Sequence, residues 1–276
     1  MEYREYEPPP ALRRHVQCAW RLYDDAPSSA IRTIYPDGRC ELVAHFAQPP
    51  RALHAPGGWQ PQARQLFVAQ QRGPVRLVAE GRLDCVGVRL RPAASAVVVE
   101  EPVQWRDRVA DLAELDGEFA THFAAAGARF RADPADAAFW SLIGSRVLTC
   151  DIDERIETAV DRLESNDGRG RIESTARLVG MSLRGFQTRF LACVGLSAKE
   201  FARLLRLQAT IKALDTGDDA LSQLALDAGF SDQAHATREL TRLTGVTPSR
   251  LRAALRNDRG GDDAIRLAAA FVRGRA

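Results

Sequence analysis

Hydrophobic and polar positions follow different periods in the two halves of the chain. Up to about residue 102, short apolar runs alternate with Pro, Gly and Asp turns, a pattern typical of β-strands. The predicted strands are Ile31–Tyr35, Cys40–Phe46, Val75–Ala79 and Asp84–Leu90. After Trp105 the pattern becomes alanine-rich and helical, with a break at Asp133–Pro134. The sequence predicts an α+β protein with a β-rich N-terminal domain that ends in helices (1–150), an all-α domain (151–256) and a tail (257–276).

Two segments of the predicted all-α domain align with each other at a shift of fifty positions. Phe190 matches Leu240, and Gly195 matches Gly245. Each copy reads as helix, turn and helix, followed by a Gly and a hydroxyl residue that begins a further helix. Gly tolerates a positive φ at a helix end, and a Ser or Thr side chain accepts an unpaired N–H at the next helix start. One such pair is often an ordinary helical corner, but two copies in register indicate tandem helix-turn-helix units.

The first copy has a supporting helix over 172–179 and a second helix that Ser182 caps and that runs to about Ala192. Leu183, Phe186 and Phe190 share one face of the second helix and are expected to be buried. Another face carries side chains of the kinds that bond to base edges or phosphates, together with one leucine. These outward residues are Arg184, Gln187, Thr188 and Leu191.

The second copy repeats this arrangement. Residues 221–228 form its supporting helix, and Asp232 caps a helix that runs to about Thr244. Its predicted inward residues are Ala236, Leu240 and Leu243, and its outward residues are Gln233, Ala234, Thr237, Arg238 and Thr241. Between the copies, Ala198–Thr216 predicts a helix of about 28 Å. Major-groove segments on one face of B-DNA are about 34–36 Å apart, so this connector suits two recognition helices in successive grooves.

Composition adds limits to this picture. A chain of 276 residues with 45% hydrophobic and 27% charged residues suits a soluble two-domain protein. Apolar runs such as Ala93–Val99 are far shorter than the roughly 20 residues of a membrane span, and the first residues lack a signal-peptide pattern. A cytoplasmic location without membrane contact is expected. The net charge of +2 is uneven, because basic residues far outnumber acidic ones between Arg169 and Lys212.

Candidate chemistry beyond DNA binding is sparse. The sequence holds no P-loop, no GxGxxG after a strand, no G-x-S-x-G and no HExxH. We therefore predict neither an enzyme nor a cofactor. His15 with Cys18, and Cys40 with His45, are candidate metal ligands, but the five cysteines form no CxxC pair. Reduced thiols in ordinary packing and no metal site are predicted.

Four residues of the N-terminal half have two interpretations. Aromatic and basic side chains in a β-rich domain either line a ligand pocket or pack in its core. These residues are Trp20, Tyr35, Trp59 and Arg89.

Residues 229–238, with the sequence GFSDQAHATR, are followed by TGVTP at 244–248. Together they resemble the signature of the AraC/XylS family of bacterial regulators, and residues 180–190 resemble that family's first helix-turn-helix unit. The resemblance covers about Asp151–Arg256. It implies seven helices, promoter DNA and RNA polymerase as partners, and usually activation of transcription. Ala236 and Leu240 stand where the family commonly has aromatic residues, which predicts a looser second unit.

Carried over by position, the family's base-reading face falls on Arg184, Gln187 and Thr188 in the first unit. In the second unit it falls on Ala234, Thr237 and Arg238, and Arg238 is the strongest candidate for a base or phosphate contact.

The N-terminal half is similar, through residues 35–43 and 87–92, to sensor-like domains that precede such DNA-binding domains. This similarity implies a small-molecule effector, a homodimer or both. A second hypothesis is a constitutive DNA-binding protein whose N-terminal domain only dimerises or binds another protein, with the stretch Phe119–Leu148 as a candidate interface. A third is an enzyme fused to a DNA-binding module.

Overall fold

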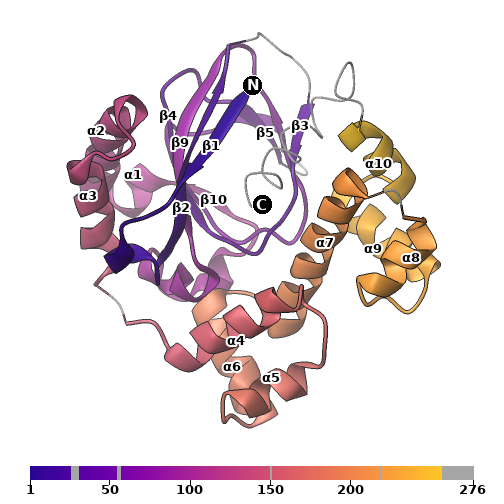
Figure 1. Ribbon diagram of the computed structural model, residues 1–276. Helices are drawn as coiled ribbons and strands as arrows, with labels where there is room; N and C mark the ends of the chain where they lie inside the picture. Colours follow the sequence, from indigo (N-terminus) through magenta and orange to yellow (C-terminus); the bar gives the residue numbers. More distant parts are fainter. Residues whose placement is uncertain (26–30, 55–56, 150, 218, 257–276) are drawn as a thin grey trace.

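The computed structural model describes residues 1–25, 31–54, 57–149, 151–217 and 219–256 (Figure 1). Its N-terminal region forms two antiparallel sheets. The larger sheet has the strand order β1-β2-β9-β4-β7-β10, and the smaller has β3-β8-β5-β6. The strands are β1 (Glu2–Tyr6), β2 (Val16–Asp24), β3 (Ile31–Ile34), β4 (Glu41–His45), β5 (Arg51–His54), β6 (Gly58–Pro61), β7 (Gln65–Val68), β8 (Val75–Val78), β9 (Leu83–Leu90) and β10 (Val109–Asp111).

Strand β9 lies inside the larger sheet, between β2 and β4, and all its residues are buried. Alternate side chains point to opposite faces of a strand. Val88 therefore packs towards the helices, while Cys85 belongs to the apolar layer between the two sheets. A Cβ at Gly87 would come within 2.2 Å of the Trp20 indole ring, so glycine is what allows Trp20 to lie there.

Three helices cover the outer face of the larger sheet: α1 (Leu112–Leu115), α2 (Gly117–Ala132) and α3 (Ala137–Val147) (Figure 1). Their aromatic rings pack together, and the centroids of Phe130 and Phe139 are 4.3 Å apart. Phe123, Phe130, Phe139 and Ile143 are fully buried. These side chains are core, so they do not form the exposed interface that was one interpretation of residues 119–148.

The C-terminal region is helical. The helices are α4 (Glu154–Ser165), α5 (Ile172–Leu178), α6 (Leu183–Val194), α7 (Ala198–Thr216), α8 (Leu221–Asp227), α9 (Gln233–Thr244) and α10 (Pro248–Arg256). The Ser182 side chain accepts a hydrogen bond from the Gly185 N–H at the start of α6, and the Asp232 side chain accepts one from the His235 N–H at the start of α9. Gly195 and Gly245 end these helices at φ values of 82° and 79°, which glycine adopts without strain.

The first helix-turn-helix unit packs directly against the N-terminal region. The 3-10 helix η2 (Pro92–Val97) contacts both α4 and α6. Apolar side chains from the outer face of the larger sheet, from η2 and from α4 to α7 form one continuous core, which also includes leucines of α8, α9 and α10. Within it, the buried amide of Gln70 donates to the carbonyl oxygen of Val194 at the end of α6. The N-terminal region and the first unit are therefore one packed body.

The predicted fold class is confirmed: a β-rich region of two sheets precedes a helical region with two helix-turn-helix units. The four predicted strands correspond to β3, β4, β8 and β9, whereas β1, β2, β5, β6, β7 and β10 were not predicted. No helix in the described part of the chain is both long and apolar enough to cross a membrane. The tail predicted at 257–276 lies outside the described residues.

Candidate nucleic-acid interface and ligand cavity

Helix α6 presents a polar face to solvent. Arg184, Gln187 and Thr188 are all exposed, while Phe186 and Phe190 on the opposite side are fully buried. Leu183 was expected to be buried but is 36% exposed, because it occupies the first turn of α6 beyond the reach of the core. The buried phenylalanines therefore orient the helix so that the three predicted site residues point outward.

Helix α9 has the same arrangement with a smaller core. Gln233, Ala234 and Arg238 are exposed, and Thr237 is half-buried. Leu240 packs inward and is 2% exposed. A small cavity of about 10 Å³ lies between α7, α8 and α9, and both Gln233 and Thr237 are part of its wall. The four predicted residues of this unit thus share one side of α9, but two of them also touch its core.

Many basic side chains of this region are engaged with the protein itself. Arg189 forms an ion pair with Asp153 at 2.7 Å, and Arg206 donates to the carbonyl oxygen of Gly168 at 2.6 Å. In contrast, no ion pair involves Arg184 or Arg238 among the described residues. Both guanidinium groups face solvent from the recognition helices, where they are available for phosphate or base contacts.

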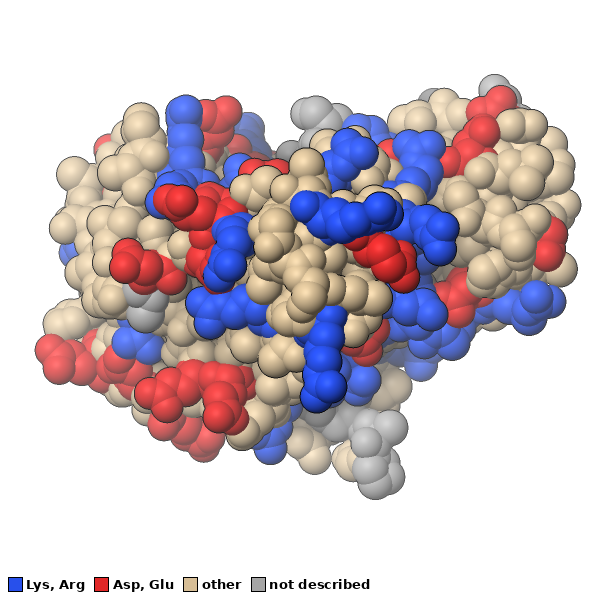
Figure 2. All heavy atoms as spheres, turned by 90° about the horizontal axis from the view of Figure 1, so that it is seen from below, with Lys and Arg blue, Asp and Glu red and all other residues tan. Residues whose placement is uncertain are grey.

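Basic side chains are also unevenly distributed over the surface of the molecule. Figure 2 shows Lys and Arg side chains gathered over the centre and right of the lower face, with Asp and Glu more frequent at its left. A basic surface of this kind attracts the phosphate backbone without regard to sequence. The exposed basic residues of the C-terminal helices include Arg177, Arg184, Lys199, Lys212, Arg238, Arg242 and Arg250.

A cavity lies between the two sheets of the N-terminal region. Its volume is about 110 Å³, and apolar groups, many of them aliphatic side chains from both sheets, form most of its wall. Three of the four N-terminal residues that the sequence left with two interpretations line this cavity, namely Trp20, Tyr35 and Arg89. Trp59 does not line it. Gln208 of α7 also lines it, so the connector between the two helix-turn-helix units reaches the cavity wall.

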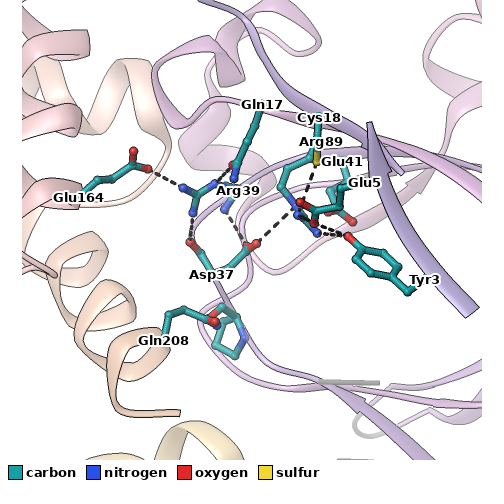
Figure 3. A network of polar contacts seen from close by, with 11 residues as sticks. Tyr3, Glu5, Gln17, Cys18, Asp37, Arg39, Glu41, Arg89, Glu164 and Gln208 are labelled. Atoms are coloured by element: carbon teal, nitrogen blue, oxygen red, sulfur yellow. Dashed lines mark hydrogen bonds and ion pairs between the residues drawn. The ribbon is translucent and has the colours of Figure 1, made fainter. Parts of the chain in front are cut away.

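One end of the cavity holds a charged network around Arg89 (Figure 3). Arg89 is 1% exposed and forms ion pairs with Glu5 at 2.6 Å and Glu41 at 2.7 Å. Burial opposes the charge of the guanidinium, but Glu41 and the neighbouring groups outweigh it and hold the pKa of Arg89 above its usual value. Arg89 stays ionised and fully engaged.

The network continues to the helices through the turn between β3 and β4. Arg39 forms an ion pair with Glu164 of α4 at 2.6 Å, and Gln208 of α7 donates to the carbonyl oxygen of Pro36 at 2.7 Å (Figure 3). Gly38 has a φ of 77°, and a Cβ there would lie 2.7 Å from the Phe201 ring. The turn therefore fits closely against both α4 and α7.

The other end of the cavity holds Arg32 and His45. Arg32 of β3 crosses to the larger sheet and forms an ion pair with Asp24 of β2 at 2.8 Å. Burial, together with the nearby Arg64, lowers the pKa of His45 to about 4, so its imidazole is neutral at pH 7. Neither Arg32 Nη1 nor His45 Nε2 has a hydrogen-bond partner among the described residues, although both atoms are buried.

The candidate metal ligands do not come together. Cys40 belongs to the core on one side of the larger sheet, whereas His45 lines the cavity on the other. In the part of the chain that the structure describes, no group of three His, Cys, Asp or Glu side chains is placed to hold a metal ion. Burial raises the pKa of Cys40 to about 12, which keeps this thiol protonated and unreactive.

Two family models match the chain. Residues 175–254 match a family described as a helix-turn-helix domain, and residues 4–111 match a family described as a domain of unknown function, DUF6597. No curated protein sequence matches the chain.

Solved structures with similar arrangements include three regulators. A transcriptional regulator with an AraC-type DNA-binding domain from Chromobacterium violaceum is 23% identical and covers 38% of this chain and 96% of its own, with a TM-score of 0.36. The DNA-binding domain of AdpA, in complex with a target DNA, is 26% identical over 39% of this chain and 96% of its own, with a TM-score of 0.36. ToxT from Vibrio cholerae is 11% identical over 84% of this chain and 98% of its own, with a TM-score of 0.47.

Proposed function

We propose that this chain, a DNA-binding transcription regulator with an AraC-type helix-turn-helix domain, reads two successive major-groove segments of a promoter and is controlled by a small molecule in its N-terminal cavity. The observation that supports the two-groove arrangement is the pair of exposed recognition faces, on α6 and α9, at the two ends of α7. Activation of transcription through RNA polymerase is the direction that the family resemblance favours.

The connector is built to hold this spacing. Helix α7 has 19 residues and starts with a capping box, in which Ser197 and Glu200 satisfy each other's backbone N–H groups. Such a helix is about 28 Å long, and successive major-groove segments are about 34 Å apart. Phe201, Leu204 and Ile211 of α7 are fully buried, so both units are attached to one rigid element.

The proposed roles follow from side-chain chemistry. Arg184 and Arg238, which form no ion pair among the described residues, suit the acceptor atoms of guanine or a phosphate, while Gln187 and Gln233 suit the edge of adenine. Thr188 and Thr237 suit a phosphate or a thymine methyl group. Ala234 allows close approach of the helix to the groove.

DNA selection with the purified full-length protein tests this proposal. We expect a motif with two short elements about one helical turn apart. Arg238→Ala should weaken binding to that motif by about 1–3 kcal/mol while sparing random DNA. The control is Arg4→Ala, which removes the same charge from an exposed position on β1. A single-element motif, or unchanged binding by both Arg184→Ala and Arg238→Ala, would contradict the proposed interface.

Control by a small molecule is supported by the contacts between cavity and helices. The wall of the cavity includes Asp37 and Arg39 of the turn that contacts α4, as well as Gln208 of α7. A molecule that binds one conformation of this turn more tightly than another shifts the population of the helix arrangements to which the turn is joined. The effector would thus change how many molecules present both recognition helices at the spacing of the grooves.

Filling the cavity tests this control without knowledge of the effector. Val43 lines the cavity and is 6% exposed, so Val43→Trp should occupy the space. We expect the affinity for the selected motif, or the output of its promoter in cells, to change several-fold. The matched control is Ile31→Trp, at a 45% exposed position of the smaller sheet. If Val43→Trp folds and behaves like Ile31→Trp, the cavity has no regulatory role and a constitutive regulator is the better description.

A further inference from the structure

We propose that the cavity takes a small, uncharged, largely apolar molecule about the size of one ring, with a hydroxyl or carbonyl oxygen held at the end formed by Arg32 and His45. This inference rests on the proposed control by a small molecule and names the chemical class of that molecule.

The size and polarity of the ligand follow from the wall. A cavity of about 110 Å³ is close to the space that a single benzene-sized molecule fills in a protein core. Its middle is apolar on both sides. The aliphatic lining residues include Leu22, Val43, Leu66 and Val68 from the larger sheet and Ile34, Val75 and Leu77 from the smaller. A compact hydrophobic body fits this space, whereas a sugar would leave its hydroxyl groups unpaired.

The charges of the wall argue for a ligand without a net charge. Each lining arginine already meets a carboxylate: Arg32 meets Asp24, Arg39 meets Glu164, and Arg89 meets both Glu5 and Glu41. A ligand carboxylate would have to compete with these protein carboxylates, and a ligand ammonium would meet arginines that are already paired. Burying a charge without a free partner is costly. Neutral ligands avoid that cost.

Two buried polar atoms show where the polar group of the ligand belongs. Within the described residues, Arg32 Nη1 and His45 Nε2 have no hydrogen-bond partner, and the two residues are 3% and 8% exposed. An unsatisfied buried group is destabilising, so a ligand oxygen that accepts from Arg32 gains what the apo protein lacks. The neutral His45 ring either donates or accepts, depending on its tautomer, and therefore suits a hydroxyl group.

The register of the larger sheet places these two groups at the same end of the cavity. Asp24, which holds Arg32, lies opposite Leu83 of β9, and His45 lies opposite Cys85. These two β9 positions are about 7 Å apart along the strand. Arg89, in the charged network at the other end, lies about 13 Å from Cys85 by the same spacing. The ligand therefore has its polar group far from α4 and α7 and its apolar body towards them.

Four one-ring probes that differ in their polar group test the ligand class on the full-length protein. Toluene has no polar group, benzyl alcohol adds a neutral oxygen, benzoate is an anion and benzylamine is a cation at pH 7. Binding is measured by titration calorimetry or ligand-observed NMR, and DNA affinity is measured with each probe present. We expect benzyl alcohol to bind about tenfold more tightly than toluene, since one extra buried hydrogen bond is worth about that factor. Benzoate and benzylamine should bind more weakly than benzyl alcohol.

Variants connect the preference to the named atoms. Removing Arg32 alone would take an ion pair from the buried carboxylate of Asp24, which also lies 3.4 Å from the N-terminal ammonium. The double variant Asp24→Leu, Arg32→Met therefore replaces both members of the pair with apolar groups. It should still bind toluene but lose most of the preference for benzyl alcohol. His45→Phe keeps a ring and should reduce that preference in part. Val43→Trp should lose both neutral probes, and their retention would place them elsewhere and overturn the proposal.

The outcomes separate this inference from the control on which it rests. If benzoate or benzylamine binds best and shifts DNA affinity, the ligand class is wrong while control by a small molecule stands. If neither neutral probe binds, the ligand class is also overturned. If the neutral probes bind as expected but Val43→Trp leaves DNA affinity and promoter output unchanged, the cavity binds the proposed class and the proposed control is what fails.

Discussion

The two helix-turn-helix units align position by position but have different cores. Phe186 and Phe190 of the first unit correspond to Ala236 and Leu240 of the second. In the first unit the ring centroids of Phe186 and Phe190 are 5.5 Å apart, and those of Phe190 and Phe201 are 5.9 Å apart. In the second unit a cavity of about 10 Å³ remains, lined by both smaller residues. The motif thus depends on its caps and turns, and its rigidity depends on how the core is filled.

The two units also differ in what holds them. The first packs directly against the N-terminal region, through η2 and the buried Gln70. The second packs on α7 and α10. Among the described residues, Arg203 pairs with Glu239 at 3.7 Å and joins α7 to α9, and Arg169 donates to the carbonyl oxygen of Asp227 in α8 at 2.8 Å. The sensor region therefore packs broadly against the first unit, whereas it meets the second through α7 and through Arg76 of β8, which lies beside Gly245 at the end of α9. A signal from the cavity should change the placement of the second unit most.

The largest expected difference between the units is in core truncation. Phe190→Ala should lower the free energy of unfolding by about 3–5 kcal/mol, and Leu240→Ala by about 2–3 kcal/mol. Because all four tryptophans lie in the N-terminal region, their fluorescence in urea reports whether that region unfolds with the mutated unit. Far-ultraviolet circular dichroism reports the helices.

We expect Phe190→Ala to shift the fluorescence and the helical transitions together, since α6 packs directly against η2 of the N-terminal region. Leu240→Ala should shift the helical transition and leave the fluorescence transition nearly unchanged. Coincident shifts in both variants would show that the two units are coupled equally to the N-terminal region, against the comparison made above.

A smaller effect is expected at the turn that joins the cavity to α7. Gly38 and Gly180 both have positive φ values, 77° and 67°, but only Gly38 has a neighbour in the space that a Cβ would fill. Gly180→Ala should therefore cost about 1–2 kcal/mol for the backbone alone. Gly38→Ala should lower the free energy of unfolding by about 1–3 kcal/mol more, because its methyl group would crowd Phe201.

The same pair of variants tests the coupling. Gly38→Ala should also change the affinity for the selected DNA motif, while Gly180→Ala, at matched backbone strain, should change it less. Thermal unfolding and a DNA titration of both proteins measure the two effects. Equal losses in stability would mean that the Phe201 contact contributes nothing.

The helix-turn-helix units could be predicted from the sequence more fully than the N-terminal cavity could. The bounds of α6, α7 and α9 were predicted to within two residues, because Ser182, Gly195, Asp232 and Gly245 are local signals that act within one turn of helix. The looser second core was also predicted, from Ala236 and Leu240. The assignment of Arg184, Gln187, Thr188 and their counterparts in α9 to DNA stays a prediction.

The cavity was much harder to predict than the helices. Arg89 meets Glu5 across 84 positions of sequence, and Arg39 meets Glu164 across 125. No local pattern reports such distant pairs, and strands such as β2 mix aromatic, charged and aliphatic residues without a clear alternation. Trp20 and Arg89 were recognised as candidates only by residue type. Arg32 gave no signal, and His45 was noted only as a candidate metal ligand, because their place at the end of the cavity exists only in the folded structure.

The smallest expected effect is the response of the two recognition helices to acid. Asp232 caps α9, and the N–H of His235, the hydroxyl of Ser231 and the charge of Arg238 lower its pKa. A carboxylate whose folded pKa is depressed stabilises the helix start above its unfolded pKa of about 3.9, and this stabilisation is lost as the pH falls through the folded value. Ser182, the corresponding cap of α6, does not ionise in this range.

Protection of the His235 amide against hydrogen exchange should therefore fall as the pH drops below about 4, relative to its intrinsic rate, while that of the corresponding Gly185 amide, bonded to Ser182, stays level. Asp153, whose carboxylate pairs with Arg189 of α6, has a lowered pKa as well, so acid also weakens the first unit away from its cap. The exchange Asp232→Ser removes this ambiguity, because it gives α9 the neutral cap of α6. If the His235 amide of that variant still loses protection in acid, a group other than the cap makes the second unit sensitive to pH.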